Sequence, residues 1–214
     1  MENRFLKVKK MDSCHSLFIV SAPSGAGKTT LVKHLLMRDK NVQLSISTTT
    51  RAPREGEKNG VDYFFTSVSD FKNKIAQNAF AEYAEVHGNF YGTSKEWLEN
   101  ALTKNDVLLE IDVQGAAQIK KVFPHAILIF ILPPSLEILK ERLTGRHTDS
   151  KEVIKKRLAA AFDELRAAVD FDYAIMNDHL ASAADELCAV VKAARCRTNF
   201  QKLRHSALFS AIQN

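Results

Sequence analysis

A short segment near the amino terminus combines small residues, a lysine and two threonines in an order suited to binding phosphate. It reads Ala22-Pro23-Ser24-Gly25-Ala26-Gly27-Lys28-Thr29-Thr30. The two glycines let the backbone curl so that successive N–H groups face one phosphate. Lys28 is spaced to reach the β- and γ-phosphates of a nucleoside triphosphate, and the Thr29 hydroxyl is spaced to bind Mg²⁺. Ala22 stands where this pattern usually has its first glycine. By itself the segment predicts binding of a nucleoside triphosphate.

A second group of residues is suited to a smaller phosphate compound. Arg51 and Arg54 lie three residues apart in a proline-containing stretch, and Tyr63 and Tyr91 follow in aromatic, glycine-containing stretches. Guanidinium groups grip phosphate through paired N–H donors. Two arginines and two tyrosines together predict a site for a monophosphate dianion.

Glu82 is a third candidate binding residue, because its neighbours in the sequence are otherwise apolar or aromatic: Phe80-Ala81-Glu82-Tyr83-Ala84. A carboxylate in such a place is suited to accept N–H bonds from N1 and the 2-amino group of guanine. Adenine offers no such pair of donors, so this residue would discriminate between the purines.

The elements that must position these residues alternate along the chain. Apolar runs typical of strands buried on both faces occur at 17–20, 107–111, 126–132 and 173–176. Helical patterns lie between them, including an apolar stripe over 154–169. This order predicts an α/β fold with a parallel sheet flanked by helices. Residues 45–93 break the alternation, which indicates an inserted subdomain.

Composition excludes several classes of protein. The chain has 214 residues, of which 45% are hydrophobic and 26% charged, as in ordinary globular proteins. Its apolar runs are too short to cross a membrane, its three cysteines form no paired framework, and its start lacks a signal-peptide core. We therefore expect a cytoplasmic protein.

The net charge of +5 is concentrated at the two ends of the chain. Residues 1–16 carry +2 and residues 192–214 carry +5, whereas the body between them carries −2. This distribution favours solvated basic ends over a nucleic-acid surface. The basic C-terminal helix is also a candidate contact between subunits of a homo-oligomer.

Three longer motifs resemble the signature of guanylate kinases: residues 47–57, Gly60-Val61-Asp62-Tyr63, and Gly88-Asn89-Phe90-Tyr91-Gly92-Thr93. The resemblance runs from about residue 16 to about residue 205. It implies a P-loop NTPase core (16–46, 94–132 and 158–205), a GMP-binding subdomain (47–93) and a mobile lid (133–157). A flexible extension (1–15) and a C-terminal tail (206–214) would flank this domain.

The family's reaction is phosphoryl transfer from MgATP to GMP, with dGMP as a second acceptor. The resemblance implies contacts to guanine by Ser47, Glu82 and Thr93. It assigns the acceptor phosphate to Arg51, Arg54, Tyr63 and Tyr91. Asp112 would contact guanine or organise the water shell of Mg²⁺. Glu110 replaces the family's usual aspartate, and we expect it to support this site indirectly.

The lid of the family carries arginines around the transferred phosphoryl group, and Arg142, Arg146 and Arg157 match them. With Lys28 and Mg²⁺ they would neutralise charge during in-line transfer, while closure excludes water. The family more often has glycine where His147 stands, so the hinge is expected to be stiffer here. We do not assign His147 as a general base, because phosphoryl transfer depends mainly on positioning and charge neutralisation.

Two alternative functions are compatible with the sequence. Some guanylate-kinase-like domains bind phosphorylated partners without catalysis, but they typically lose the phosphate loop or lid that this chain keeps. A related kinase acting on another monophosphate or a phosphorylated sugar is the second alternative, and Ser47, Glu82 and the two tyrosines favour GMP over it.

Overall fold

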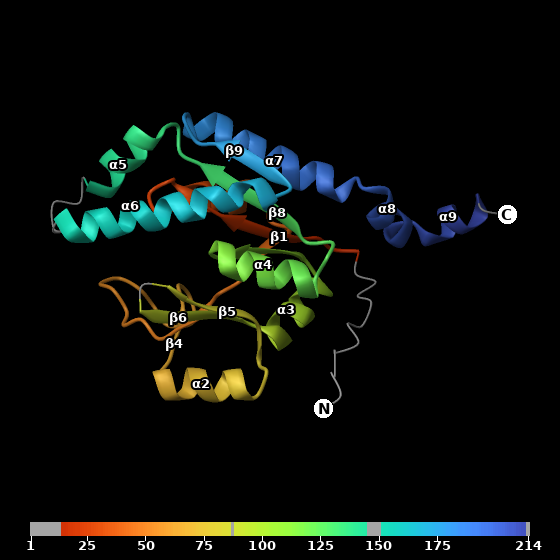
Figure 1. Ribbon diagram of the computed structural model, residues 1–214. Coiled ribbons are helices and arrows are strands. Elements are labelled where there is room, and N and C mark those ends of the chain that lie inside the picture. The colour runs from red at the N-terminus through yellow and green to blue at the C-terminus, as the bar shows by residue number, and fades with distance from the viewer. Residues whose placement is uncertain (1–13, 87, 145–150, 213–214) are drawn as a thin grey trace, which may run out of the picture.

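A computed structural model describes residues 14–86, 88–144 and 151–212, giving only the backbone for Thr144 and residues 151–157. Its core is a five-stranded parallel sheet in the order β2-β7-β1-β8-β9 (Figure 1). The strands are β1 (Leu17–Ser21), β2 (Val42–Leu44), β7 (Asp106–Glu110), β8 (Ile127–Leu132) and β9 (Tyr173–Met176).

Both faces of this sheet are covered by helices. Phe18 and Val20 of β1 face the cluster that includes α1 (Lys28–Arg38) and α7 (Leu180–Arg195). Leu17 and Ile19 point the other way, into the cluster with α3 (Lys95–Leu102) and α4 (Val113–Val122). Successive side chains of a strand point to opposite faces, so a strand covered on both sides must be apolar throughout. The predicted α/β fold with a flanked parallel sheet is confirmed.

A second, four-stranded sheet lies below the core in Figure 1, with α2 (Val68–Ala76) beneath it. Its order is β4-β3-β6-β5, in which β3 pairs with β6 and β6 with β5 antiparallel. The strands are β3 (Thr48–Thr49), β4 (Phe64–Phe65), β5 (Phe80–Val86) and β6 (Asn89–Ser94).

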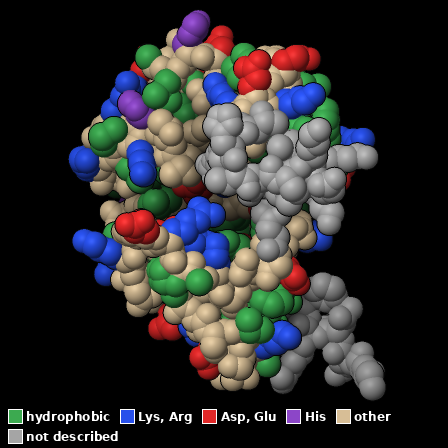
Figure 2. Space-filling view, turned by 90° about the vertical axis from the view of Figure 1, so that its left-hand side faces the viewer, with side chains coloured by type: hydrophobic (Ala, Val, Ile, Leu, Met, Phe, Trp, Pro, Cys, Tyr) green, Lys and Arg blue, Asp and Glu red, His purple; other side chains and the backbone are tan. Residues whose placement is uncertain are grey.

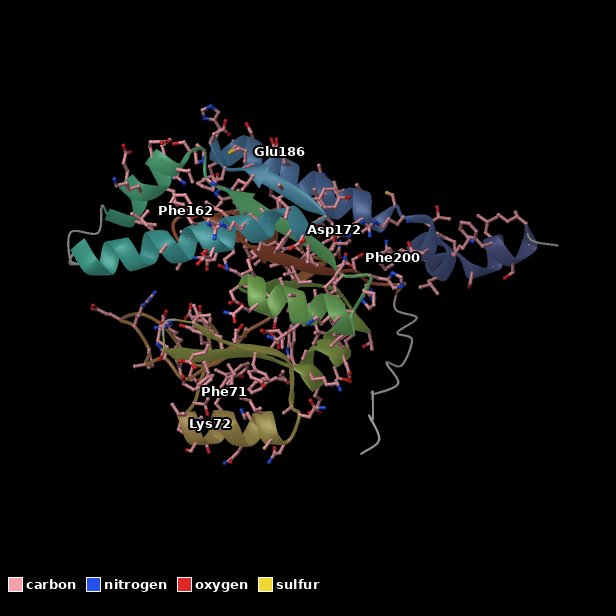
Figure 3. All side chains as sticks on the ribbon, in the orientation of Figure 1. Phe71, Lys72, Phe162, Asp172, Glu186 and Phe200 are labelled. Atoms are coloured by element: carbon pink, nitrogen blue, oxygen red, sulfur yellow. The ribbon has the colours of Figure 1, made fainter. Side chains whose placement is uncertain are left out.

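Aromatic packing joins α2 to this second sheet. Phe71 is fully buried and stacks on Phe80 and Phe90, with ring centroids 4.5 and 5.4 Å away. Figure 3 shows Phe71 directed at the sheet and its neighbour Lys72 directed away from it. The sheet is tied to the core through α4, because Gln118 of α4 donates to the Tyr83 carbonyl (2.7 Å) and accepts from the Tyr83 N–H (3.2 Å).

The remaining helices follow β8 and β9. Helices α5 (Leu136–Thr144) and α6 (Lys151–Arg166) pack on each other through Leu139, Leu143 and Ala161, and the 3₁₀ helix η1 (Ala167–Asp170) follows α6. Helices α8 (Thr198–Arg204) and α9 (Ser206–Ala211) extend away from the core toward the C-terminus (Figure 1). None of the helices within the described ranges is long and apolar enough to cross a membrane.

Sequence patterns predicted four of the five core strands and missed β2, whose three residues are too few to show a pattern.

At the ends of the chain the structure adds detail to the predicted extension and tail. Cys14 accepts a hydrogen bond at its carbonyl from Arg204 (3.1 Å), and the stretch expected to be a C-terminal tail contains α9.

Candidate active site

The phosphate-binding segment forms the turn between β1 and α1. Gly25 and Gly27 have φ values of 88° and 92°, in the left-handed region that favours glycine. Gly27 is the N-cap residue of α1, and no side chain caps this helix. The amide groups at the start of α1 are therefore available to a ligand, and the helix dipole favours an anion there.

Lys28 and Thr29 both contact the end of β7. The Lys28 ammonium donates to the Ile111 carbonyl over 3.4 Å, and the Thr29 hydroxyl donates to a carboxylate oxygen of Glu110. The parallel register of β1 and β7 produces this arrangement, since Val20 pairs with Glu110. Ligands of open α/β sheets bind at these carboxyl ends of the strands. Glu110 is therefore closer to the phosphate loop than the sequence indicated.

Three side chains from distant parts of the chain contact this loop. The carboxyl group of Glu164, on α6, lies close to the Ser24 N–H and to Lys28. Burial raises the pKa of Glu164, although the Ser24 N–H and the Lys28 charge both favour its carboxylate form. Arg142 of α5 donates to the Gly25 carbonyl over 3.4 Å, and Asn177 donates to the Ala26 carbonyl over 2.7 Å. Sequence analysis missed Glu164 and Asn177, because no local motif marks them.

A buried polar site lies in the second sheet. Glu82 of β5 pairs with Thr93 of β6, is 3% exposed, and accepts a 2.6 Å hydrogen bond from the Thr93 hydroxyl. Thr48 of β3 pairs antiparallel with Gly92, and Ser47 immediately precedes β3. Glu82 and Thr93 thus lie on the adjacent strands β5 and β6, and Ser47 directly precedes β3, the next strand of the same sheet.

The electrostatic environment of Glu82 is unusual. Burial raises its pKa to about 7, and the nearby Asp112 charge raises it too, against the lowering effect of the Thr93 hydrogen bond. Asp112 itself caps α4 by accepting from the Gly115 N–H over 2.9 Å. A Cβ at Gly115 would lie 2.6 Å from a carboxylate oxygen of Glu82, so any larger residue there would displace this carboxylate.

Arg51 lies in a prearranged cluster. Its Nη2 donates to both carboxylate oxygens of Glu57 (2.8 and 3.0 Å), and its guanidinium carbon lies 5.2 Å from the centroid of the Tyr63 ring. Hydrogen bonds to Glu57, and secondarily to Tyr91, raise the pKa of Arg51. The Tyr63 and Tyr91 rings meet edge to face at 6.0 Å. Glu57 was not among the predicted site residues.

Arg54 is placed beside this cluster mainly through its backbone. The Arg54 N–H donates to a carboxylate oxygen of Glu57 over 2.8 Å. The pKa of Glu57 is lowered mainly by its hydrogen bond with Arg51, then by this N–H, and to a smaller extent by the charge of Arg54. The structure thus brings Arg51, Tyr63 and Tyr91 into direct contact, and joins Arg54 to them through Glu57.

The phosphate loop and the Arg51 cluster face a common space. The pKa of Tyr63 is raised by burial and by the charges of Tyr91 and Glu110. Glu110 lies at the end of β7, across from the second sheet. Figure 2 shows a hollow on this face between the upper and lower parts of the molecule, with Lys and Arg side chains gathered at its lower edge. The arrangement can hold two phosphate compounds facing each other.

Part of the predicted lid falls outside the described residues. Arg146 and His147 lie in the segment 145–150, and Arg157 lies on α6 where only the backbone is described. Arg142 is the one predicted lid arginine whose side chain is described.

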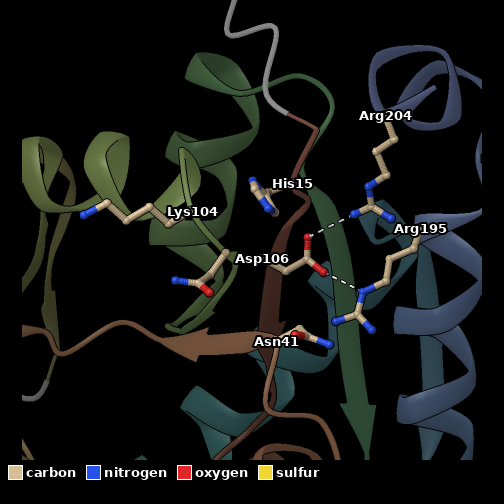
Figure 4. A pocket seen from close by; sticks show the side chains of 7 residues that line it. His15, Asn41, Lys104, Asp106, Arg195 and Arg204 are labelled. Atoms are coloured by element: carbon tan, nitrogen blue, oxygen red, sulfur yellow. Dashed lines mark hydrogen bonds and ion pairs between the residues drawn. The ribbon is translucent and has the colours of Figure 1, made fainter. Parts of the chain in front are cut away.

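A second pocket, separate from this site, lies at the opposite end of the core strands (Figure 4). It has a volume of about 290 Å³ and lies where β1 and β7 begin. Asp106, 2% exposed, binds the Arg195 Nε at 2.5 Å, and the Arg195 Nη1 binds Asp39 at 2.6 Å. These ion pairs fasten the end of α7 to the sheet.

The phosphate loop also offers donors for a magnesium ion. Magnesium prefers oxygen ligands and usually keeps waters and substrate phosphates in its shell. The Thr29 hydroxyl and the Glu110 carboxylate, in contact with each other, form an oxygen donor pair of that kind. Within the described part of the chain, no group of three His, Cys, Asp or Glu residues forms a metal site made by protein alone. The donors present fit an ion that arrives with nucleotide phosphates.

Known proteins similar to this chain include guanylate kinases. The family model described as guanylate kinase matches residues 15–194. The guanylate kinase of Dechloromonas aromatica is 57% identical over 198 residues, which cover 92% of this chain and 98% of that protein. The one from Neisseria meningitidis serogroup A is 53% identical over 188 residues, 87% of this chain and 91% of that protein. The crystal structure of guanylate kinase from Anaplasma phagocytophilum superposes with a TM-score of 0.74 at 33% identity, covering 87% of this chain and 89% of that one.

Proposed function

The chain belongs to the guanylate kinase family, and from this premise we propose how its own residues transfer the γ-phosphoryl group of ATP to GMP, giving ADP and GDP. The observation that carries the acceptor assignment is the buried Glu82, which is bonded to Thr93 of β6, the strand that also carries Tyr91 of the Arg51 cluster. A buried carboxylate beside a phosphate-binding group is what recognition of a guanine monophosphate needs. The same site would take dGMP, because none of these contacts involves the sugar.

We assign ATP binding to the loop between β1 and α1. The N–H groups at the start of α1 hold the phosphates, and Lys28 moves from the Ile111 carbonyl to the β- and γ-phosphate oxygens. The residues that form this site are Ala22, Pro23, Ser24, Gly25, Ala26, Gly27, Lys28, Thr29 and Thr30.

We assign GMP binding to the second sheet and to the start of α4. Ionised Glu82 accepts from N1–H and the 2-amino group of guanine, and Ser47 and Thr93 supply hydroxyls at its edge. Arg51, Arg54, Tyr63 and Tyr91 hold the phosphate, and Asp112 supports the base end of the site through its position beside Glu82.

Magnesium would be held by the Thr29 hydroxyl, with Glu110 beside it and the ATP phosphates completing its shell. When bound, the ion supplies positive charge that draws electron density from the transferred group. The Thr29–Glu110 contact positions the threonine hydroxyl before the nucleotide arrives.

The transfer step needs positioning more than acid–base chemistry. A phosphate oxygen of GMP attacks the γ-phosphorus of ATP, a new P–O bond forms, and the bond to the β–γ bridging oxygen breaks to release ADP. Lys28 and Arg142 lie on the loop side of this centre. Arg146 and Arg157 complete our assignment of charge-neutralising residues. Closure of the lid would exclude water from the reaction.

Two further proposals concern the protein's surroundings. The described cysteines Cys14, Cys188 and Cys196 are free thiols, which agrees with a reducing compartment such as the cytoplasm. Leu208 and Ile212 near the C-terminus are 62% and 66% exposed, which supports the C-terminal helices as a contact between copies of the chain.

The test is a coupled assay of ADP release with MgATP and each of GMP, AMP, CMP and UMP as acceptor. Turnover with GMP and little with the other three is the expected result. A folded protein that binds GMP but turns over none of the acceptors would instead be a binding module. Equal turnover with AMP would contradict the assigned role of Glu82.

A further inference from the structure

The side-chain amide of Gln118, on α4, binds both backbone groups of Tyr83, on β5. Its Nε2 donates to the Tyr83 carbonyl over 2.7 Å, and its Oε1 accepts from the Tyr83 N–H over 3.2 Å. Within the described second sheet, β5 is an end strand that pairs with β6 on one side. Gln118 therefore supplies to Tyr83 the two hydrogen bonds that a further strand would make.

This contact lies next to the proposed guanine-binding carboxylate, because Tyr83 directly follows Glu82. The register between β5 and β6 shifts between Phe80 and Glu82, where β5 has one residue more than β6. Such a bulge interrupts the ladder and changes the direction of nearby side chains. The pairing with β6 is thus irregular just before Glu82, and the Gln118 amide holds the strand from the other side.

Helix α4 is a fixed support for this contact. Its residues Ala116 and Ile119 are fully buried in the core cluster below the first sheet. Gly115 and Gln118 are three positions apart, so they lie on one face of the helix. A Cβ at Gly115 would lie 2.6 Å from a Glu82 carboxylate oxygen. The same face of α4 therefore meets the carboxylate at one point and the strand backbone at the next.

We propose that Gln118 is a positioning residue for guanine: by binding the Tyr83 backbone, it keeps the Glu82 carboxylate against the start of α4, in place for the N–H groups of the base. It acts through β5 and does not touch the nucleotide. This role rests on the proposed guanine contact of Glu82. Both described hydrogen bonds of the Gln118 amide go to β5, whereas ATP is assigned to the loop between β1 and α1, so the effect belongs to the acceptor.

The test is the variant Gln118→Met, which keeps an unbranched side chain of similar length and removes both hydrogen bonds. Loss of these bonds predicts a rise of about three- to tenfold in the KM of GMP at saturating ATP. The KM of ATP at saturating GMP should stay within about twofold of wild type.

A second acceptor, inosine monophosphate (IMP), distinguishes positioning of Glu82 from a general effect on packing. IMP lacks the 2-amino group of guanine, so it offers Glu82 one N–H in place of two. The wild type should therefore favour GMP over IMP in kcat/KM by about tenfold or more. A displaced carboxylate gains less from the second N–H, and Gln118→Met should lower this preference by about threefold or more. General loosening of the sheet would weaken both acceptors equally.

Gln77→Met is the matched control, because it makes the same substitution at the exposed C-cap residue of α2. It should leave both KM values and the preference for GMP unchanged. Gln118→Asn, whose amide is one methylene too short for the Tyr83 backbone, replaces Gln118→Met if that variant does not fold, with the same expected direction of change.

An unchanged KM for GMP in a folded Gln118 variant would overturn the proposal. So would an equal rise for GMP and ATP, or an unchanged preference for GMP over IMP. A wild type that phosphorylates IMP as well as GMP would refute the assigned role of Glu82, and one that phosphorylates neither would refute the proposed function. These failures are therefore distinguishable.

Discussion

The proposed role of Glu82 in binding guanine predicts that the affinity for GMP depends on pH. Only the ionised carboxylate can accept both N–H groups of guanine, and burial raises the pKa of this group to about 7. The ionised fraction is then about 0.9 at pH 8 and about 0.1 at pH 6. The Kd for GMP should therefore rise about tenfold between pH 8 and pH 6.

The same shift has a consequence for stability. Because the folded-state pKa lies above the ordinary value of 4.5, the folded protein binds this proton more tightly than the unfolded chain. Stability therefore falls as pH rises from about 4.5 to about 7, by roughly 3 kcal/mol for this group. Replacing the carboxylate with an amide removes that cost. Glu82→Gln should consequently raise the Tm at pH 8 while weakening GMP binding about 10- to 100-fold.

Isothermal titration of GMP into the wild type and Glu82→Gln at pH 6, 7 and 8 measures both effects. The variant also serves as the control for titration of the GMP phosphate, because it retains that titration and loses the one at position 82. Glu85→Gln, on the exposed face of the same strand, controls for the loss of one acidic charge. If the ratio of the two Kd values does not change with pH, or if Glu82→Gln weakens ATP as much as GMP, the assigned role of Glu82 is wrong.

Four other substitutions test the proposed mechanism and the packing of the fold. Lys28→Ala should lower kcat by about 10³-fold or more with an unchanged Tm, since it removes a charge used in the transition state; near-normal turnover would contradict this. Glu110→Ala should raise the Mg²⁺ concentration needed for half-maximal activity several-fold, and a magnesium titration at saturating ATP would detect it. Arg195→Ala leaves the buried Asp106 without its closest cation and should lower the free energy of unfolding by about 3 kcal/mol, as measured in urea. Phe71→Ala should cost about 3–5 kcal/mol in the same assay, because it removes a fully buried ring; a loss below about 1 kcal/mol would show that α2 is not anchored by this residue.

Local sequence determined the phosphate loop and most of the core sheet. The loop is contiguous, so its glycines, Lys28 and Thr29 indicate their geometry without reference to the rest of the chain. The strands in the middle of the core sheet are apolar on both faces, as residues 17–20 of β1 are, and this pattern can be recognised without knowing which strands lie beside them. The edge strand β2 has only three residues and depends on pairing with β7, so its pattern carried no comparable information.

Tertiary structure decided which residues from distant segments meet. The bond from Asn177 to the Ala26 carbonyl and the contact of Glu164 with the Ser24 N–H arise because parallel strands bring the end of β9 and the helix before it beside the loop. Nothing in the segments around Asn177 or Glu164 marks either residue.

The state of Glu82 shows the same division between sequence and structure. Its apolar neighbours suggested a base-reading carboxylate, but its raised pKa requires burial against α4, room left by Gly115 and the charge of Asp112. Sequence determines which groups a chain carries and the local conformations that they favour. Desolvation and charge interactions depend on distances between segments, and those distances exist only after the strands have paired.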